Sequence, residues 1–293
     1  MNIPVYIRRR FGLVATVIAC AVSAPVLASE SVRLDKFPTE KMQSMPALQD
    51  GARTFVNYCL NCHSASMMRF NRLQDIGLTD EQISGSLQFT EGRVGDLMKV
   101  AMRHEDGKAW FGAAPPDLSV EARARASESG SGADWIYTYL RSYYRDGSRE
   151  TGWNNAIFPN VGMPNPLWQW QGMRGAVEER VAPVTDEATG KVTGWTKTTI
   201  TYDREGNKSE KVEKVDGDGL HEGTHFTLGT PEGGTLSQAE FDDKVANLVA
   251  FMKFMSDPSA STRGRLGIWV LLFIALFVGC TWWLNREYWK DIK

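Results

Sequence analysis

Cysteine is scarce in this chain of 293 residues, which contains only four. Cys59 and Cys62 are separated by two residues, whereas Cys20 and Cys280 lie in apolar segments at opposite ends of the chain. A four-ligand zinc ribbon needs a second closely spaced pair, and a disulfide-stabilised scaffold needs more than one candidate bridge. The cysteine count therefore argues against both of these protein classes.

The chain also lacks an excess of charge of either sign. Its 33 lysines and arginines stand against 35 acidic residues, which leaves a formal net charge of -2. A net charge of this size more often reflects an ordinary solvated surface than a surface that steers a charged partner. Nucleic acid is not expected among the partners, and no internal repeat is apparent.

The segment Cys59-Leu60-Asn61-Cys62-His63 is the most informative motif that is present. Two cysteines separated by two residues and followed at once by histidine form the attachment signature of a c-type haem. Each thiol adds to one vinyl group of the porphyrin, and the adjacent imidazole lies beneath the iron. A disulfide within the motif and half of a zinc site are the alternatives. The motif predicts one covalently attached haem c, held by Cys59 and Cys62, with His63 as an axial iron ligand.

The N-terminus has the pattern of a secretory signal peptide. Arg8-Arg9-Arg10 precedes an apolar run from Phe11 to Leu27, and Ala28 provides a small residue for cleavage. We therefore predict that residues 1–28 are a signal peptide. The alternatives are an uncleaved N-terminal anchor and a lipoprotein-type site that would leave Cys20 lipidated.

Near the C-terminus, Leu266 to Leu284 form nineteen residues without a charge. At about 1.5 Å per residue such a helix is ~28 Å long, close to the thickness of a bilayer's hydrocarbon core. A buried core helix is the alternative, and uninterrupted apolarity disfavours it. Basic residues flank the span on both sides, so its orientation rests mainly on the signal peptide. Residues 263–293 are predicted to be a transmembrane anchor with a short cytoplasmic tail.

Between the two ends, residues 29–262 are long and polar enough to form one exported domain. Helical spacing of apolar residues predicts a helix over 51–58 capped by Asp50, a helix over 93–104, and a helix capped by Asp134. Ser237 and Glu240 form a capping box that starts a further helix, which ends at Asp257-Pro258.

Residues 175–234 differ from the rest of this domain. Thr198, Ile200 and Tyr202 alternate with other residues, and the turn-forming segment 203–207 follows them. This pattern predicts a β-hairpin insertion at the surface. The expected fold is therefore mainly α, a c-type cytochrome haem domain with loop and β-hairpin insertions and one C-terminal transmembrane helix.

A haem iron needs either a sixth ligand or an open site, and methionine is the best candidate ligand here. Met163 lies in the segment 158–166, whose prolines prevent helix continuation and whose Gly162 allows close approach to a flat cofactor. Most other methionines fit core positions. His104 is a rival ligand, although a helix-end histidine is the simpler interpretation.

Four segments in order carry a family resemblance: Cys59–His63, Trp110–Ser119, Phe158–Pro164 and the C-terminal span. Together they resemble bacterial cytochrome c1, and the similarity covers nearly all of the mature chain. The resemblance supports Met163 as the second axial ligand. It also implies that Arg125 pairs with a haem propionate, for which an ordinary surface arginine is the alternative.

The resemblance further implies membership of a dimeric cytochrome bc1 complex in a bacterial inner membrane, with the haem domain on the periplasmic side. The chain would accept an electron from the Rieske iron-sulfur protein and pass it to a soluble or tethered cytochrome c. Cytochrome b would be its neighbour and membrane lipid would surround its anchor. The quinol chemistry belongs to cytochrome b, so the chain is not expected to be an enzyme on its own.

Two departures from the family pattern limit this inference. The region from Thr193 to Phe226 is long and hairpin-like compared with the mitochondrial members, and the role of the insertion at about 175–234 stays open. Some bacterial members brace the haem pocket with an additional disulfide, and no spare exported cysteine pair exists here. Packing of the loop must therefore hold Met163.

Other functions also remain open from the residues. His221–His225 matches the zinc-protease pattern HExxH, but the glycine-rich context makes the required helix improbable. A membrane-tethered monohaem cytochrome that acts as a shuttle or as an oxidase subunit is a stronger alternative, and a purely structural anchor is a weaker one. The sequence does not define the midpoint potential or the acceptor cytochrome.

Overall fold

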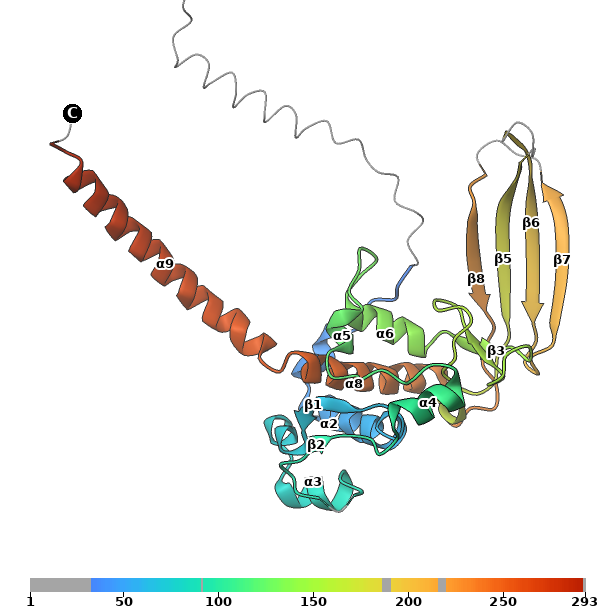
Figure 1. Ribbon diagram of the computed structural model, residues 1–293, viewed down its shortest axis with the longest axis horizontal. Coiled ribbons are helices and arrows are strands. Elements are labelled where there is room, and N and C mark those ends of the chain that lie inside the picture. The colour runs from blue at the N-terminus through green and yellow to red at the C-terminus, as the bar shows by residue number, and fades with distance from the viewer. Residues whose placement is uncertain (1–32, 91, 186–190, 216–219, 292–293) are drawn as a thin grey trace, which may run out of the picture. The chain divides into compact units, whose positions relative to one another are not determined.

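The computed structural model describes residues 33–90, 92–185, 191–215 and 220–291. The predicted signal peptide at 1–28 lies outside these residues. Helix α8 (Gln238–Ser256) is central to the fold, because it packs against α2 (Met45–Thr54), α5 (Glu121–Ala124) and α6 (Gly132–Leu140). Figure 1 shows α8 running between α6 and α2.

The contact between α2 and α8 requires glycine at one position. A Cβ atom at Gly51 would lie 2.0 Å from the backbone oxygen of Asn247, so only glycine allows the two helices to approach this closely. The apolar side of α8 is buried in the hydrophobic core, through residues that include Phe241, Val245, Leu248 and Phe251.

Short elements complete this domain. The helical segments are η1 (Thr39–Gln43), η2 (Phe55–Cys59), η3 (Phe70–Ile76), α3 (Asp80–Ser86), α4 (His104–Phe111) and α7 (Trp168–Gln171). The strands are β1 (Ala65–Arg69), β2 (Leu97–Met98), β3 (Tyr143–Arg145) and β4 (Trp153–Asn155). Strand β1 pairs antiparallel with β2, and β3 pairs antiparallel with β4.

The predicted β insertion is confirmed, and it is larger than a hairpin. Strands β5 (Ala176–Thr185), β6 (Val192–Tyr202), β7 (Lys208–Val215) and β8 (Gly223–Leu228) form an antiparallel sheet in the order β7-β6-β5-β8. Figure 1 shows these four long strands side by side. A small apolar cluster of Tyr144, Ala176, Ile200 and Tyr202 joins the sheet to β3.

Helix α9 (Ala260–Tyr288) is long and apolar enough to cross a membrane. An 18-residue window within its segment Thr262–Tyr288 has a mean hydropathy of 2.1, and the rest of the described chain buries none of that window. The fold is thus mainly helical, with strands and one C-terminal apolar helix, as the sequence predicts.

Two local predictions are wrong. Residues 93–104 do not form a helix, because Met98 is fully buried in β2 opposite Ala65 and tertiary pairing overrides the helical spacing. Helix α2 begins at Met45 rather than after Asp50, since the Ser44 side chain accepts a hydrogen bond from the backbone N–H of Ala47.

The two remaining capping predictions have different outcomes. Asp134 is the third helical residue in a capping box, and Ser131 occupies the N-cap of α6. The Ser237–Glu240 capping box is confirmed, and α8 ends at Ser256 with Asp257 as its C-cap.

Candidate haem site

The two cysteines of the CxxCH motif lie on one tight turn at the end of α2. The π-helical segment η2 ends at Cys59, and the backbone N–H of Leu60 donates to the oxygen of Phe55. The N–H groups of Cys62 and His63 both donate to the oxygen of Cys59, at 3.1 Å and 2.9 Å. This turn presents both thiols and the imidazole from a single loop, as attachment to one porphyrin requires.

Both thiols of the motif are free, so the alternative of a disulfide between them finds no support. Cys59 is buried and Cys62 is half-buried. Burial, reinforced by the nearby Cys62 thiol, raises the pKa of Cys59 to about 12. The Cys59 thiol is therefore protonated at neutral pH.

The imidazole of His63 is oriented by a backbone carbonyl. Its Nδ1 lies 2.7 Å from the oxygen of Pro116, a carbonyl that can only accept, so Nδ1 carries the proton and donates it. Nε2 then has a free lone pair, which is the form that binds a metal. Burial lowers the pKa of His63, which favours the neutral ring.

The segment that supplies the Pro116 carbonyl is itself fixed to the chain beyond His63. Asp117 accepts hydrogen bonds from the backbone N–H groups of Ser66 and Ser119, at 2.8 Å and 2.9 Å. The N–H of Leu118 donates to the oxygen of Ser64 at 2.8 Å. The Trp110–Ser119 motif thus acts as a brace for the imidazole, a role that local sequence patterns do not reveal.

Met163 lies in a loop that hydrogen bonds hold in place. Asn154 Oδ1 accepts from the N–H of Asn160 at 2.8 Å, and Arg149 Nη2 donates to the oxygen of Asn160 at 3.0 Å. Asn160 has a φ of 62°, a left-handed conformation that asparagine tolerates better than most residues. These hydrogen bonds hold the Met163 loop in place, so the loop does not depend on an additional disulfide.

Two tyrosines contact Met163 directly. Tyr139 Oη lies 3.5 Å from Met163 Sδ, and Tyr143 Oη lies 3.3 Å from the Met163 backbone oxygen. Met163 also packs against the hydrophobic core that contains Cys59. The predicted thioether ligand and one predicted attachment cysteine therefore border the same core.

Arg125 belongs to the same cluster. Its guanidinium carbon lies 4.5 Å from the centroid of the Trp135 ring, which stacks on Tyr139 with the centroids 4.9 Å apart. Arg125 Nε also donates to Glu121 at 2.5 Å. The arginine is thus connected through Trp135 and Tyr139 to Met163, rather than being an isolated surface charge.

The donor set fits a haem better than a bare metal ion. It contains two free thiols on one turn, a neutral imidazole with Nε2 available, and a thioether. Within the described part of the chain, no group of three His, Cys, Asp or Glu side chains could hold an ion. These residues therefore suit an iron that already sits in a porphyrin ring.

The HExxH alternative has the wrong backbone. His225 lies in strand β8, opposite Glu179 of β5, and the segment before it is not helical. A zinc protease needs both histidines on one face of a helix, so this segment cannot form that site. His104, the rival haem ligand, is the first residue of α4.

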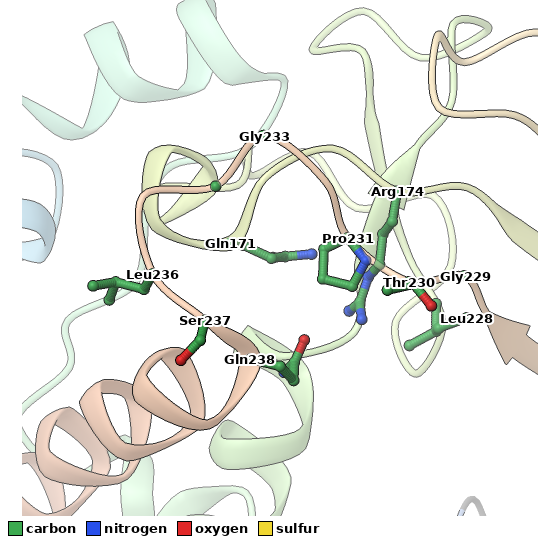
Figure 2. Close-up of a pocket in the computed structure, with 11 residues that line it drawn as sticks. Gln171, Arg174, Leu228, Gly229, Thr230, Pro231, Gly233, Leu236, Ser237 and Gln238 are labelled. Atoms are coloured by element: carbon green, nitrogen blue, oxygen red, sulfur yellow. The ribbon is translucent and has the colours of Figure 1, made fainter.

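A pocket of about 430 Å³ lies away from the predicted haem residues, between the end of α7, the segment 228–234 and the start of α8. Figure 2 shows Gln171 and Arg174 among the residues that line it. Arg174 donates to the backbone oxygens of Tyr143 and Arg141, near the C-terminal end of α6. Burial lowers the pKa of Arg174 to about 10, and these carbonyls account for its position without a ligand.

Fold and site together define a membrane-anchored c-type cytochrome. Residues 37–174, which include all five predicted haem residues, match the family model described as the Cytochrome C1 family. The chain is 34% identical to cytochrome c1 of Allochromatium vinosum, over 86% of each chain. It is also 24% identical to cytochrome c1 of Rhodospirillum rubrum, over 85% of this chain and 82% of that one.

A further relative is named ammonia monooxygenase gamma subunit, from Nitrosomonas europaea. It is 39% identical to this chain, over 92% of this chain and 94% of its own length. The chain belongs to the cytochrome c1 family, the c-type haem subunits of cytochrome bc1 complexes. It is therefore a redox subunit of such a complex, its haem transfers electrons within that complex, and its apolar C-terminal helix fits a membrane anchor.

Proposed function

We propose that this chain binds one haem c covalently through Cys59 and Cys62 and uses it to relay single electrons. His63 and Met163 are the axial ligands of the iron. The observation that carries the proposal is the hydrogen bond from His63 Nδ1 to the oxygen of Pro116, because it leaves Nε2 free for iron. The haem, when bound, supplies the one-electron ferric-ferrous couple.

The side chains around the ligands prepare them for electron transfer. The Pro116 carbonyl holds the imidazole in one tautomer and orientation, which also raises its basicity as a ligand. A thioether ligand raises the reduction potential. The Met163 side chain therefore suits acceptance of an electron from a high-potential donor.

Arg125 is proposed to pair with a haem propionate. Its guanidinium is partly exposed and lies against Trp135, next to the tyrosine that contacts Met163. A carboxylate there would receive a charge-assisted hydrogen bond in addition to the existing contact with Glu121.

The donor is proposed to be the Rieske iron-sulfur protein, and the acceptor a soluble or tethered cytochrome c. Cytochrome b is the neighbouring subunit, and the complex is dimeric. Residues 1–28 are removed on export, residues 29–262 form the periplasmic haem domain, and residues 263–293 form the anchor and a short cytoplasmic tail. The exposed apolar segment Thr262–Tyr288, which follows the proposed haem residues in the chain, supports this topology.

Purification in mild detergent through a tag on this chain tests the proposal. We expect the reduced-minus-oxidised spectrum to show a c-type band together with b-type haem, and a Rieske protein to co-purify. A c-type band from this chain alone would contradict membership of the complex and favour the tethered shuttle. Co-purification with a monooxygenase instead would favour the role in the name of the Nitrosomonas relative.

Matched cysteine variants test the attachment. Cys62→Ser should abolish the two-bond covalent attachment, so that the normal c-type band is lost. Cys280→Ser, in the exposed apolar helix, should leave the band unchanged. Equal haem content and spectra in the two variants would contradict the assignment.

A further inference from the structure

The hydroxyl groups of Tyr139 and Tyr143 form a pair beside Met163. Their oxygens are 2.7 Å apart. Tyr139 Oη lies 3.5 Å from Met163 Sδ, and Tyr143 Oη lies 3.3 Å from the Met163 backbone oxygen. One side chain therefore offers the pair two acceptors, one on its thioether and one on its main chain.

Two phenol protons cannot serve all three contacts at once. In one arrangement Tyr143 donates to the Met163 carbonyl and Tyr139 donates to Tyr143, so the thioether receives no proton. In the other arrangement Tyr143 donates to Tyr139 and Tyr139 donates to Sδ, so the carbonyl loses its tyrosine donor. The hydroxyl pair thus has two states that differ in whether a hydrogen bond reaches the sulfur.

The surroundings hold the two rings in place. Tyr143 is fully buried, and 9% of Tyr139 is exposed. Trp135 stacks on Tyr139, and Asn155 Nδ2 donates to the Tyr139 backbone oxygen at 2.8 Å. Little water reaches these hydroxyls, so they have few other partners and the competition between their acceptors matters.

Burial also keeps both phenols protonated. It raises the pKa of Tyr139, although Tyr143 and Arg125 partly oppose this effect. Burial raises the pKa of Tyr143 further. Neither hydroxyl loses its proton near neutral pH, so both remain available as donors.

The sulfur of a ligating thioether is a better hydrogen-bond acceptor when the iron is ferrous, because it then gives less electron density to the metal. Hydrogen bonds to iron ligands are one of the ways in which a protein adjusts a haem potential. A donor aimed at the sulfur should therefore stabilise the reduced state more than the oxidised state and raise the potential.

We infer that the Tyr139–Tyr143 hydroxyl pair sets the reduction potential of the iron by dividing the Tyr139 proton between Met163 Sδ and Tyr143 Oη. Tyr139 raises the potential as the donor to sulfur, and Tyr143 moderates it as the competing acceptor. This inference rests on the proposed ligation by Met163. Both tyrosines are positioning residues, since neither is an iron ligand.

Two matched substitutions, each of which removes one buried hydroxyl, test the inference in the intact detergent-solubilised complex. Tyr139→Phe removes the donor to sulfur, so the equilibrium constant for reduction should fall about threefold, or ~30 mV at about 59 mV per tenfold for one electron. Tyr143→Phe removes the competing acceptor. Of the two acceptors, only Met163 Sδ then remains for the Tyr139 proton. The potential of this variant should therefore rise above that of the parent.

Redox titration of the c-type band gives the potentials, and the sulfur-to-iron charge-transfer absorption of the oxidised protein reports ligation. An unchanged or higher potential in Tyr139→Phe, or an unchanged or lower potential in Tyr143→Phe, would overturn the inference. Loss of the charge-transfer band in Tyr139→Phe would also overturn it, because the hydroxyl would then retain the ligand rather than adjust its potential. Absence of the band in the parent protein would instead refute ligation by Met163.

Discussion

The two proposed iron ligands reach the site by different means. His63 follows Cys62 directly, so the tight turn that carries the thiols also carries the imidazole, and only the Pro116 carbonyl comes from a distant segment. Met163 depends on separate parts of the chain for its position, through Tyr139, Tyr143 and the loop bonds to Asn160. Substitutions away from the motif should therefore affect Met163 ligation more than His63 ligation.

Arg125 and Arg123 are neighbouring arginines that provide a matched pair of substitutions. Arg125→Gln should lower the reduction potential, because loss of a positive charge beside the proposed haem propionate favours the ferric state. Arg123→Gln should leave the potential unchanged, since Arg123 has no ring contact with Trp135 in the described structure. Redox titration of the two variants checks this expectation. Equal reduction potentials in the two variants would show that Arg125 is an ordinary surface arginine.

Asp50 couples stability to pH. It accepts hydrogen bonds from Lys244 at 2.6 Å, Asn247 at 2.9 Å and Arg53 at 2.8 Å. Burial alone would raise the pKa of Asp50, but these bonds outweigh it and the pKa lies below its ordinary value. The stabilisation is therefore present above the unfolded-state pKa of about 3.9 and is lost as the pH falls through the lower folded-state pKa.

Asp50→Asn should accordingly cost about 1.5–3 kcal/mol of stability at pH 7, the usual range for hydrogen bonds to a charged group. The difference from the parent should begin to shrink below about pH 4, where Asp50 of the unfolded parent becomes protonated, and should continue to shrink as the pH falls towards the lower folded-state pKa. Thermal unfolding of both proteins between pH 3 and pH 7 measures it. A difference that stayed constant over this range would show that charge on Asp50 is not what stabilises the contact.

Sequence reasoning identified residues whose chemistry is local and missed those that act across the chain. The CxxCH spacing and the Pro-Gly context of Met163 were readable from neighbouring residues alone. The roles of Asn154 and Tyr139 cannot be predicted from neighbouring residues. Their partners lie in the Met163 loop, which contacts β4 and α6 only in the folded protein. The spacing of four between Tyr139 and Tyr143 was visible, but it is equally common in an ordinary helix.

At the scale of elements, the α2–α8 contact limits what α2 tolerates. Gly51→Ala should destabilise the protein by about 3 kcal/mol, since the new methyl group would overlap the Asn247 backbone and push the helices apart. Gly85→Ala in α3 meets no atom within 4 Å and should stabilise by up to ~0.8 kcal/mol through helix propensity. Chemical denaturation compares the two variants, and similar effects of both would refute the close helix approach.

The elements also show why helical periodicity misled at 93–104. Val94, Leu97 and Met98 satisfy a helical pattern, but Asp96 closes a turn by accepting the N–H of Arg93, and its backbone oxygen accepts the N–H of Phe70. Pairing of β2 with β1 then buries Met98 completely. A short apolar segment can satisfy a helical pattern and still form a strand when a partner strand is available.

At the scale of the whole molecule, the order of parts was predictable and the extent of the insertion was not. The uncharged run at 266–284 identifies the apolar helix by length alone. Strand β7 is exposed along nearly all of its length and rich in charge, so it has no apolar alternation. It joins the sheet through backbone pairing with β6, a contact that hydropathy cannot indicate.

The position of α9 outside the core leads to a prediction about the complete chain. Truncation after Pro258 removes the apolar helix, and the described chain buries none of the Thr262–Tyr288 segment. The truncated protein should therefore be released from membranes into the soluble fraction and keep its c-type spectrum, since α8 and the proposed haem residues remain. Fractionation followed by haem staining measures both properties. Truncation after Tyr288 is the control, and it should stay in the membrane. A soluble fraction without haem-stained protein would show that α9 contributes to folding of the haem domain as well as to anchoring.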